Sequence, residues 1–485
     1  MGEREDIGIK NPKERFSKWF SEVIAKAELA DIRYNVKGFV VFREWSVLAM
    51  EEMYKLYERE LQRRGHKPVW FPAVIPEENF EKEAEHVEGF CPEVFWVTHA
   101  GDKKLEKRLA LRPTSETAMY SMYSIWVRSW RDLPLKLYQR AQVWRYETKA
   151  TRPFIRSREF YWLEAHDVFA TREEAERQVK EDMEMTETIM HREFGVPFIF
   201  MKRPEWDKFA GAVYTFAADS LMPDGKIIQQ PSTHLLGQNF SKPFDIKFID
   251  RNEKEEYAWQ TCYGPCISRI FASVVALHGD DKGLRFPFKI APLQVIIIPI
   301  GAEKSERVME FCREVRETLY NADLRVEIDD SKNTPGWKFN QWEMKGVPIR
   351  LEIGPKESEN NFVTLVRRDT NERKKVSLEN LIETVFEEGK KLTENLVKQS
   401  DEFFKNNFRE AKTWEELERE IKKGGFVRIP FCSTGKDGLA CAERIKEELH
   451  GDVRGERADK MEEPHGNCVV CGKKANHIVY VGKQY

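Results

Sequence analysis

Residues 137–169 read LYQRAQVWRYE, TKATRPFIRS and REFYWLEAHDVF in succession, and this stretch decides the fold. Its first and last parts predict two strands, and the polar middle part predicts a loop that joins them into a hairpin. Because strand side chains alternate between faces, each strand presents one set to a common surface. These side chains are Arg145 and Glu147 from the first strand, and Phe160, Trp162, Glu164 and His166 from the second.

The side chains on this surface have the chemistry of a binding site. The planar guanidinium of Arg145 donates hydrogen bonds in pairs, which suits a phosphate or a carboxylate. The ring of Phe160 is suited to stacking on a base. Arg145 and Glu147 alone would be more typical of an exposed sheet face with ion pairs. Two aromatic rings, an imidazole and a second carboxylate on the neighbouring strand favour a binding site instead.

The segments around the hairpin predict helices and further strands. Residues 13–30 and 44–64 carry apolar residues at helical spacing, and Gly65 stops the second helix. Thr171 with Glu174 predicts a capping box that opens a long helix, to about residue 193. The other expected elements are a short strand ending at Pro72, strands at 227–240 and 245–250, and a strand turning into a buried helix over 257–278. Together they predict an antiparallel sheet flanked by helices.

A second unit begins at APLQVIIIPIG (291–301), where strands and helices alternate. The pattern predicts a small α/β domain with mostly parallel strands. Its expected elements after the first strand are a helix at 303–321, a strand at 324–328, a helix at about 336–345 and a strand at 348–353. A charged helical stretch over 377–423 follows. The sequence thus predicts a multidomain protein of α+β and α/β class, divided into residues 1–290, 291–376 and 377–485.

Composition sets limits on the class of protein. At 485 residues the chain is too long for a single hydrophobic core. Its net charge of −3 gives no global basic field, although an RNA partner needs only a local basic face. The start, MGEREDIGIK, has no apolar core, and the longest apolar run (293–300) is too short to span a bilayer. We therefore expect a cytoplasmic protein that makes no membrane contact.

Half of the eight cysteines lie near the end of the chain and predict a metal site. They form two pairs: Cys432 and Cys441 (C-x8-C), and Cys468 and Cys471 (C-x2-C). Four thiolates suit one tetrahedral zinc ion, and Gly472 suits the tight turn after the last pair. Four ordinary buried thiols are the alternative. The histidines that could replace a thiolate are His450, His465 and His477.

The motifs around the hairpin resemble those of class II aminoacyl-tRNA synthetases. R-x-E, a basic loop and R-x-x-x-F, from Arg145 to Phe160, resemble motif 2. The strand from Gly65 to Pro72 resembles motif 1, and residues 264–269 before an apolar helix resemble motif 3. From end to end the chain is similar to the prolyl-tRNA synthetases of archaeal and eukaryotic type. The pieces that carry this likeness are RPTSE (112–116), WLEAHDVF (162–169), KFAGAVYT (208–215), HLLGQNFSK (234–242), HGDDKGL (278–284) and PGWKFNQWEMKGVPIRLEIGPK (335–356).

This resemblance implies an enzyme that activates proline with ATP and Mg²⁺ and transfers it to tRNA. Arg145, bridging the ATP α-phosphate and the proline carboxylate, and Arg269, holding the outer phosphates, would be the catalytic residues. Proline would be bound by Thr114, Glu116, Arg145, Trp162, Glu164, His166, Phe209 and His234. ATP would be bound by Arg145, Glu147, Arg156, Ser157, Phe160, Gln229, Ser232 and Arg269.

The resemblance also implies partners. Glu343, Arg350 and Lys356 fall where relatives read two guanines of the anticodon, although Glu343 and Arg350 alone would suggest an ordinary ion pair. Motif 1 around Pro72 implies a homodimer. A terminal tyrosine such as Tyr485 implies a chain end that approaches the active site. The short separation of motifs 2 and 3 leaves no room for the hydrolytic insertion of bacterial prolyl enzymes.

Some features depart from the family pattern, and alternatives remain. Motif 3 reads Gly264-Pro265-Cys266-Ile267-Ser268-Arg269, and Ser232-Thr233 stands where relatives commonly have Thr-Ser. Cys262 and Cys266 have C-x3-C spacing, but a strand-turn at an ATP site rarely doubles as a metal site. One alternative function is a sister synthetase for threonine, glycine, serine or histidine. The other is a synthetase-like RNA-binding or regulatory protein without charging activity.

Overall fold

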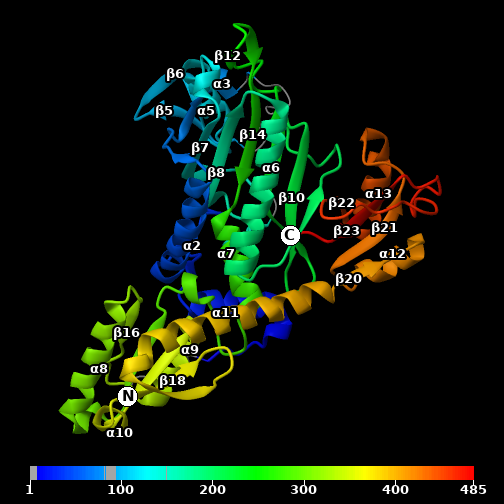
Figure 1. Cartoon of the computed structure of the whole chain (residues 1–485). Coiled ribbons are helices and arrows are strands. Elements are labelled where there is room, and N and C mark those ends of the chain that lie inside the picture. The colour runs from blue at the N-terminus through cyan, green and yellow to red at the C-terminus, as the bar shows by residue number, and fades with distance from the viewer. Residues whose placement is uncertain (1–7, 81, 83–93, 149) are drawn as a thin grey trace.

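An eleven-stranded sheet runs through the computed structural model, which describes residues 8–80, 82, 94–148 and 150–485 (Figure 1). In order across the sheet the strands are β20 (Phe408–Glu410), β21 (Phe426–Phe431), β23 (His477–Gly482), β22 (Asp452–Arg457), β9 (Ile199–Lys202), β10 (Tyr214–Leu221), β11 (Ile227–Gly237), β14 (Trp259–Gly264), β8 (Glu159–Phe169), β7 (Leu135–Trp144) and β3 (Lys67–Pro68). From β22 to β7 every neighbouring pair is antiparallel, which confirms the predicted sheet type.

Helices cover one face of this sheet. They are α1 (Phe16–Lys26), α2 (Glu44–Arg63), α6 (Arg172–Thr186) and α7 (Ile267–His278). Leu163 and Ala165 of β8 lie in the same buried core as Trp19, Tyr57 and Phe271 of these helices. Because side chains alternate along a strand, the even-numbered residues of β8 face the opposite side of the sheet. That side remains available for a binding site.

The helix signals in the sequence are confirmed. Gly65 has φ +91°, a left-handed conformation that glycine adopts without strain, and it follows the last turn of α2. The Thr171 hydroxyl accepts a hydrogen bond from the Glu174 backbone N–H, completing the capping box of α6. Beyond Thr186 the helix continues as a π-helix to Glu193. The strand and buried helix predicted over 257–278 are β14 and α7.

Two predictions about strands near the hairpin are wrong. The strand expected to end at Pro72 is confined to β3, Lys67–Pro68, because each proline in this segment lacks the N–H that a ladder needs. Strand β7 ends at Trp144, so Arg145 and Glu147 lie just beyond it rather than on its face. The Arg145 backbone N–H still donates to the Arg158 carbonyl oxygen at 3.0 Å, which extends the hairpin by one bond.

Smaller sheets surround the large one. A three-stranded sheet of β4 (Val74–Pro76), β6 (Lys103–Leu111) and β5 (Trp96–Ala100) lies beside α3 (Glu77–Phe80) and α5 (Glu116–Trp126). Two short pairs are β1 (Ala30–Asp31) with β2 (Val41–Phe42), and β12 (Lys247–Ile249) with β13 (Glu255–Tyr257). Cys91 lies outside the described residues.

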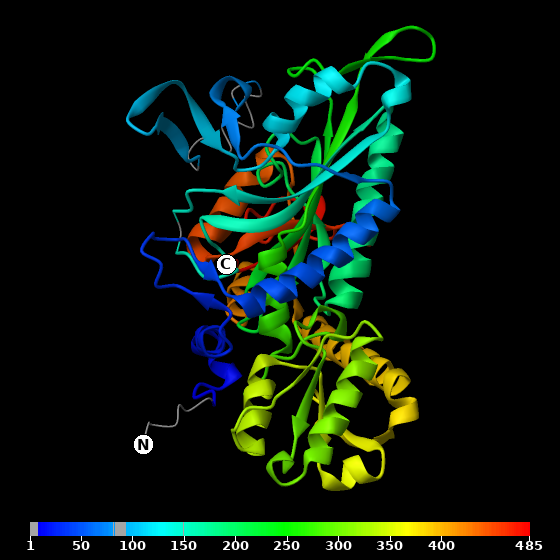
Figure 2. The same ribbon diagram turned by 90° about the vertical axis from the view of Figure 1, so that its left-hand side faces the viewer.

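The second unit is the five-stranded sheet at the bottom of Figures 1 and 2. Its parallel strands, β16 (Val326–Ile328), β15 (Val295–Pro299) and β17 (Ile349–Ile353), were predicted, as were helices α8 (Glu306–Tyr320) and α9 (Pro335–Lys345). The sequence prediction did not include two antiparallel strands, β18 (Phe362–Arg367) and β19 (Arg373–Ser377), or the short helix α10 (Pro355–Glu359).

The helical stretch predicted over 377–423 is two helices rather than one. Helix α11 (Leu381–Lys405) crosses from the second unit to the C-terminal unit (Figure 1), and β20 separates it from α12 (Trp414–Ile421). Helix α13 (Leu439–Leu449) completes the C-terminal unit. Its strand β22 pairs with β9, so the C-terminal unit continues the large sheet. Among the described residues no helix is both long and apolar enough to cross a membrane.

Candidate active site

The hairpin of β7 and β8 forms the wall of a cavity on the face of the sheet opposite to α1, α2, α6 and α7. Val143 lies opposite Phe160 in the register of the pair. Phe160, Trp162, Glu164 and His166 all line this first cavity, which confirms that they share one face. The predicted set for the small substrate lines it completely, since Thr114, Glu116, Arg145, Phe209 and His234 are also present.

One end of the first cavity is a buried polar cluster. Glu164 and His166 are almost fully buried, and the His166 Nε2 lies 3.1 Å from a Glu164 carboxylate oxygen. Glu116, the first residue of α5, places an oxygen 3.9 Å from His166 Nδ1. Burial lowers the pKa of His166, but the Glu116 and Glu164 carboxylates outweigh it and leave that pKa raised. Two carboxylates around one imidazole leave negative charge, which suits a substrate ammonium group.

Further contacts fix the carboxylates of this cluster. The Thr114 hydroxyl donates to Glu116, and the Ser115 hydroxyl donates to Glu164. The Gln139 amide donates to Glu164 at 2.9 Å. Burial raises the pKa of Glu164, and the hydrogen bond and charge of His166 outweigh it and lower that pKa. Glu164 therefore stays ionised at neutral pH although it is buried.

Aromatic side chains form the remaining walls. The Phe209 and His234 rings lie 4.7 Å apart between centroids. Burial lowers the pKa of His234 to about 3, so its ring is neutral, and its nitrogens bond the hydroxyls of Thr215 at 2.8 Å and Ser232 at 2.9 Å. Trp162 packs edge-on to Phe160 at 5.7 Å. A small apolar ring fits between such walls better than a polar chain does.

A second cavity adjoins the first and carries the predicted nucleotide set except Ser232. The two cavities share Arg145, Phe160, Gln229, Cys266 and Arg269. Glu147, Arg156 and Ser157 line the second cavity, whereas Ser232 lines the first.

Arginine side chains surround the junction of the two cavities. The Arg145 guanidinium lies 5.3 Å from the Phe160 ring centre, and its Nε donates to the Pro113 carbonyl oxygen at 3.0 Å. Arg269, near the start of α7, donates to the backbone oxygens of Gln229 and Ile155 at 3.2 and 3.3 Å. Guanidinium groups held in this way can neutralise charge on a phosphate or a carboxylate that reaches the junction.

Several lining residues were missed by sequence reasoning. Arg203, Asp207, Lys208, Thr215, Gln230 and Cys262 also line the first cavity. Arg203 follows β9, a strand of four residues that the sequence prediction did not include. Cys262 lies with Glu116 and His166, all three ligand atoms within 4.8 Å of one another, whereas Cys266 lies beside the Tyr161 carbonyl oxygen. Cys262 and Cys266 therefore do not form a pair.

The end of the chain enters the second cavity, as expected. Tyr485 lines it together with Gln484. The Tyr485 backbone N–H donates to the Ile227 carbonyl oxygen at 3.2 Å, and its hydroxyl donates to Asp224 at 2.6 Å. Tyr485 is thus held through its backbone oxygen, its amide N–H, its hydroxyl and its ring.

The residues predicted to read an anticodon lie in the second unit. Glu343 of α9 and Arg350 of β17 form an ion pair of 3.2 Å. Arg350 also donates to Glu352 at 3.1 Å, and Lys282 from the first unit lies 3.3 Å from Glu343. Lys356, in α10, is exposed.

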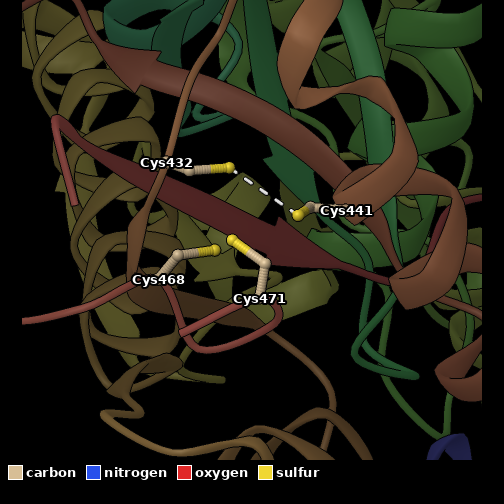
Figure 3. Close-up of side chains that lie close together, drawn as sticks. All are labelled: Cys432, Cys441, Cys468 and Cys471. Atoms are coloured by element: carbon tan, nitrogen blue, oxygen red, sulfur yellow. Dashed lines mark hydrogen bonds between the residues drawn. The ribbon is translucent and has the colours of Figure 1, made fainter. Parts of the chain in front are cut away.

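The four C-terminal cysteines converge, as Figure 3 shows. The sulfur atoms of Cys432, Cys441, Cys468 and Cys471 all lie within 4.8 Å of one another. The Cys432 and Cys441 sulfurs are 3.7 Å apart. Sulfurs about 2.3 Å from a tetrahedral centre lie roughly 3.8 Å from each other, so the geometry fits one zinc ion. Gly472 has φ +72°, as the turn after the last pair requires, and no histidine joins this cluster among the described residues.

Comparison with known proteins decides the family. Residues 95–278 match the family model of the tRNA synthetase class II core domain (G, H, P, S and T), 294–388 that of an anticodon binding domain, and 414–485 that of the prolyl-tRNA synthetase C-terminal domain. A proline–tRNA ligase from Thermofilum pendens is 52% identical over 97% of this chain and 98% of its own length. The chain belongs to the prolyl-tRNA synthetase family.

Solved prolyl-tRNA synthetases share the whole fold. The enzyme from Giardia lamblia in complex with prolyl-adenylate aligns with a TM-score of 0.93 at 36% identity, covering 99% of this chain and 100% of its own. The enzyme from Cryptosporidium parvum complexed with L-proline and AMP aligns at 0.90 and 33%, covering 99% and 98%. The class II synthetase fold is confirmed, and the match to prolyl enzymes is favoured over a sister synthetase or a non-charging protein.

Proposed function

We propose that this prolyl-tRNA synthetase activates L-proline with ATP in the two adjoining cavities and transfers it to tRNA(Pro). The observation that carries the proposal is the junction at Arg145, where the predicted proline set and nucleotide set meet. The test is charging of tRNA(Pro) with labelled proline by the purified protein. Proline incorporation into acid-precipitable tRNA that depends on ATP supports the proposal, and its absence with folded protein contradicts it.

In the first cavity, we assign the proline ammonium to the cluster of Glu116, Glu164 and His166. A secondary ammonium offers two N–H donors, and the carboxylate oxygens there are acceptors. Trp162, Phe209 and the neutral His234 would enclose the pyrrolidine ring. When the pyrrolidine ring lies at this end of the first cavity, the proline carboxylate would point to Arg145 at the junction.

In the second cavity, we assign adenine to the face of Phe160, with Glu147, Arg156, Ser157 and Gln229 as further contacts. Ser232, which lines the first cavity, would contact the nucleotide from that side. A proline carboxylate oxygen attacks the α-phosphorus, a bond forms between them, and the bond to the pyrophosphate oxygen breaks. Arg145 and Arg269 neutralise charge on the reacting groups. Mg²⁺ bound to ATP would supply further neutralisation of the phosphates. The terminal ribose hydroxyl of tRNA then attacks the activated carbonyl, releasing AMP.

The anticodon of tRNA(Pro) is assigned to Glu343, Arg350 and Lys356 in the second unit. Arginine and lysine donate to guanine O6 and N7, and a carboxylate accepts from the N1 and N2 edge. The Glu343–Arg350 ion pair would hold both side chains in position to contact the guanine base. We place the divisions at 290/291 and 376/377 because this unit has a separate sheet, whose last strand, β19, ends within one residue of the second division, at Ser377.

We assign one structural zinc ion to Cys432, Cys441, Cys468 and Cys471. Four thiolates fill a tetrahedral sphere, so no position is left for a substrate. The ion would hold the turn at Gly472 and thereby the last strand, β23, which leads to Tyr485. Its role would be to position Tyr485 rather than to take part in the reaction.

We also propose a homodimer through motif 1 around Pro72, in the cytoplasm. Trp70 is 91% exposed, and Ile125 and Trp126, at 53% and 42%, are other large apolar side chains with high exposure. The Trp126 ring lies 5.9 Å from that of Phe71, which places it beside the motif 1 segment. Apolar side chains gathered on a surface favour a protein interface. The mass in solution, measured by light scattering, tests this assignment.

A further inference from the structure

A buried charge cluster lies where the C-terminal unit joins the large sheet. Asp219 of β10 is fully buried and bonded through both carboxylate oxygens by two arginines. Arg203 donates to it at 2.7 and 2.8 Å, and Arg454 of β22 donates at 2.9 Å from each of two nitrogens. Burial alone would raise the pKa of Asp219, and the two guanidinium charges outweigh it and lower that pKa. Asp219 is therefore an ion held between two units of the chain.

The backbone brings these three side chains together by irregularities in the strands. The register of β10 shifts between Ala217 and Asp219, and that of β22 shifts between Val453 and Gly455. Such bulges turn a side chain away from its usual direction. Gly455 has φ +113°, and a Cβ there would lie 2.0 Å from the Lys202 carbonyl oxygen, so β22 approaches β9 more closely than another residue would allow. This close approach places Arg454 beside Arg203, which lines the first cavity.

The cluster ends at an atom of the nucleotide set. Arg203 donates from Nη2 to the Gln229 side-chain oxygen at 3.2 Å, and Gln229 lies opposite Asp219 in the register of β10 and β11. A guanidinium has donors and no acceptor, so the oxygen of the Gln229 amide must face Arg203. The NH₂ group of Gln229 is then the end left for the cavity. An amide held in this orientation offers a donor to a ligand.

We propose that Arg454 is a positioning residue for the nucleotide: through Asp219 and Arg203 it fixes the Gln229 amide so that its NH₂ group donates to an acceptor atom of ATP. The C-terminal unit thereby contributes to the nucleotide site from a strand far along the chain. Arg203 also donates to the Arg454 carbonyl oxygen at 2.7 Å. Arg454 therefore holds the Arg203 guanidinium through its backbone directly and through its side chain by way of Asp219. This inference rests on the proposed role of the second cavity as the ATP site.

Asp207 gives the cluster a second connection, toward the proline end. Its carboxylate lies 3.6 Å from both Arg203 and Arg454, and Phe209 follows two residues later. Asp207 is partly exposed, whereas Asp219 has no exposure, so solvent screens the Asp207 contacts more strongly. The effect of losing Arg454 should therefore be larger on ATP than on proline.

The test compares Arg454→Met with Arg457→Met in the full-length protein. Arg457 lies in the same strand, also beside β9, but its guanidinium bonds Asp459 at the surface. Binding of ATP without proline is measured by calorimetry, which needs no charging activity. We expect the Kd for ATP to rise about fivefold in Arg454→Met, the size of one misplaced hydrogen bond, and to stay within about twofold of wild type in Arg457→Met. An unchanged Kd in folded Arg454→Met would overturn the proposal.

A double variant separates positioning from general loosening. If Arg454 acts through Gln229, then Arg454→Met adds nothing to the loss already caused by Gln229→Leu. Losses that multiply in the double variant would contradict the proposal. If Arg454→Met does not fold, Arg454→Lys keeps the charge but not the paired donors and should show a smaller rise in the same Kd; an unchanged Kd there also counts against it. A wild-type protein that binds ATP but does not activate proline would instead contradict the proposed function alone.

Discussion

Arg156 donates a hydrogen bond to the backbone oxygen of Tyr485, and its other nitrogen bonds Glu147 at 3.0 Å. The last residue of the chain is therefore a partner of a residue from the loop of the hairpin. Both line the second cavity. The position of the chain end and the position of Arg156 are thus linked in the same ion pair network.

Deletion of Tyr485 tests this link. Without Tyr485, Arg156 loses the backbone oxygen that accepts from its guanidinium, a charge-assisted partner worth about 1.5 kcal/mol or more, and we expect the KM for ATP to rise about tenfold. Tyr485→Phe keeps the backbone oxygen and loses the bond to Asp224, so it should change the KM much less. The measurement is ATP–pyrophosphate exchange at saturating proline. A KM that falls on deletion would mean that Tyr485 competes with ATP instead.

Arg145→Ala should abolish proline-dependent exchange. Loss of one charge-assisted contact made in the transition state commonly costs about 2.7–4 kcal/mol, or about 10²–10³ in rate. Arg140→Ala is the matched control, because Arg140 lies in β7, the strand that leads to Arg145, with its guanidinium on the Tyr54 ring of α2, on the other face. Exchange at the wild-type rate in Arg145→Ala would remove Arg145 from the catalytic residues.

Discrimination among small amino acids should be incomplete. Alanine lacks two methylenes of proline and cysteine is close in size, and binding alone discriminates by only about 1–3 kcal/mol per methylene. We expect measurable adenylation of alanine or cysteine in an exchange assay with highly purified amino acids. The prediction is contradicted if the enzyme discriminates against both amino acids by more than roughly 10⁵-fold without hydrolysing wrong products.

Changes at the anticodon site should separate two activities. Arg350→Ala should weaken aminoacylation of tRNA and leave exchange intact, because Arg350 lies in the second unit, on a sheet separate from both cavities. Arg316→Ala, in α8 of the same unit and over the Tyr320 ring, serves as control. A loss of exchange equal to the loss of aminoacylation would contradict separate sites.

Asp182 should make stability depend on pH. Burial and the neighbouring Asp167 charge raise the pKa of Asp182 to about 7, although Thr233 and Gln178 donate to it at 2.7 and 2.8 Å. Between about pH 4 and pH 7 the folded protein keeps a proton that the unfolded chain releases, so stability falls as pH rises through this window. Asp182→Asn should remove this dependence and raise the Tm at pH 8 relative to wild type more than at pH 5, measured by calorimetry. An equal difference at both pH values would contradict it.

The zinc assignment predicts about one zinc per chain. Cys468→Ser should lose the metal and lower the Tm, and it should affect exchange less than stability because none of the four cysteines lines either cavity. Cys312→Ser removes a buried thiol of α8 and should keep the metal. Elemental analysis after purification without chelator gives the result. Protein free of metal would refute the assignment.

Much of the hairpin could be predicted from sequence because its signals are local. The alternation of Phe160, Trp162, Glu164 and His166 places their side chains on one face of the strand, and this depends only on local backbone geometry. The prediction failed at Arg145 and Glu147, where β7 ends although the pattern continues. An extended pattern does not reveal where pairing stops.

The Asp219 cluster could not be predicted, because its members come from distant strands. Asp219 and Arg454 are 235 residues apart, and neither position carries a local signal for the other. Strand β9, which brings Arg203 to the cavity, has only four residues and one exposed side chain, so it shows no alternation. Strands buried on both faces lack the period that sequence reasoning needs.

The central claim is that proline and ATP meet at Arg145 between the two cavities. ATP–pyrophosphate exchange by the wild-type protein, measured with each of the twenty amino acids in turn, tests it most directly. The account predicts strong exchange with proline, weak exchange with alanine or cysteine, and loss of all three in Arg145→Ala. Strongest exchange with another amino acid, or proline-dependent exchange that survives in Arg145→Ala, would contradict it.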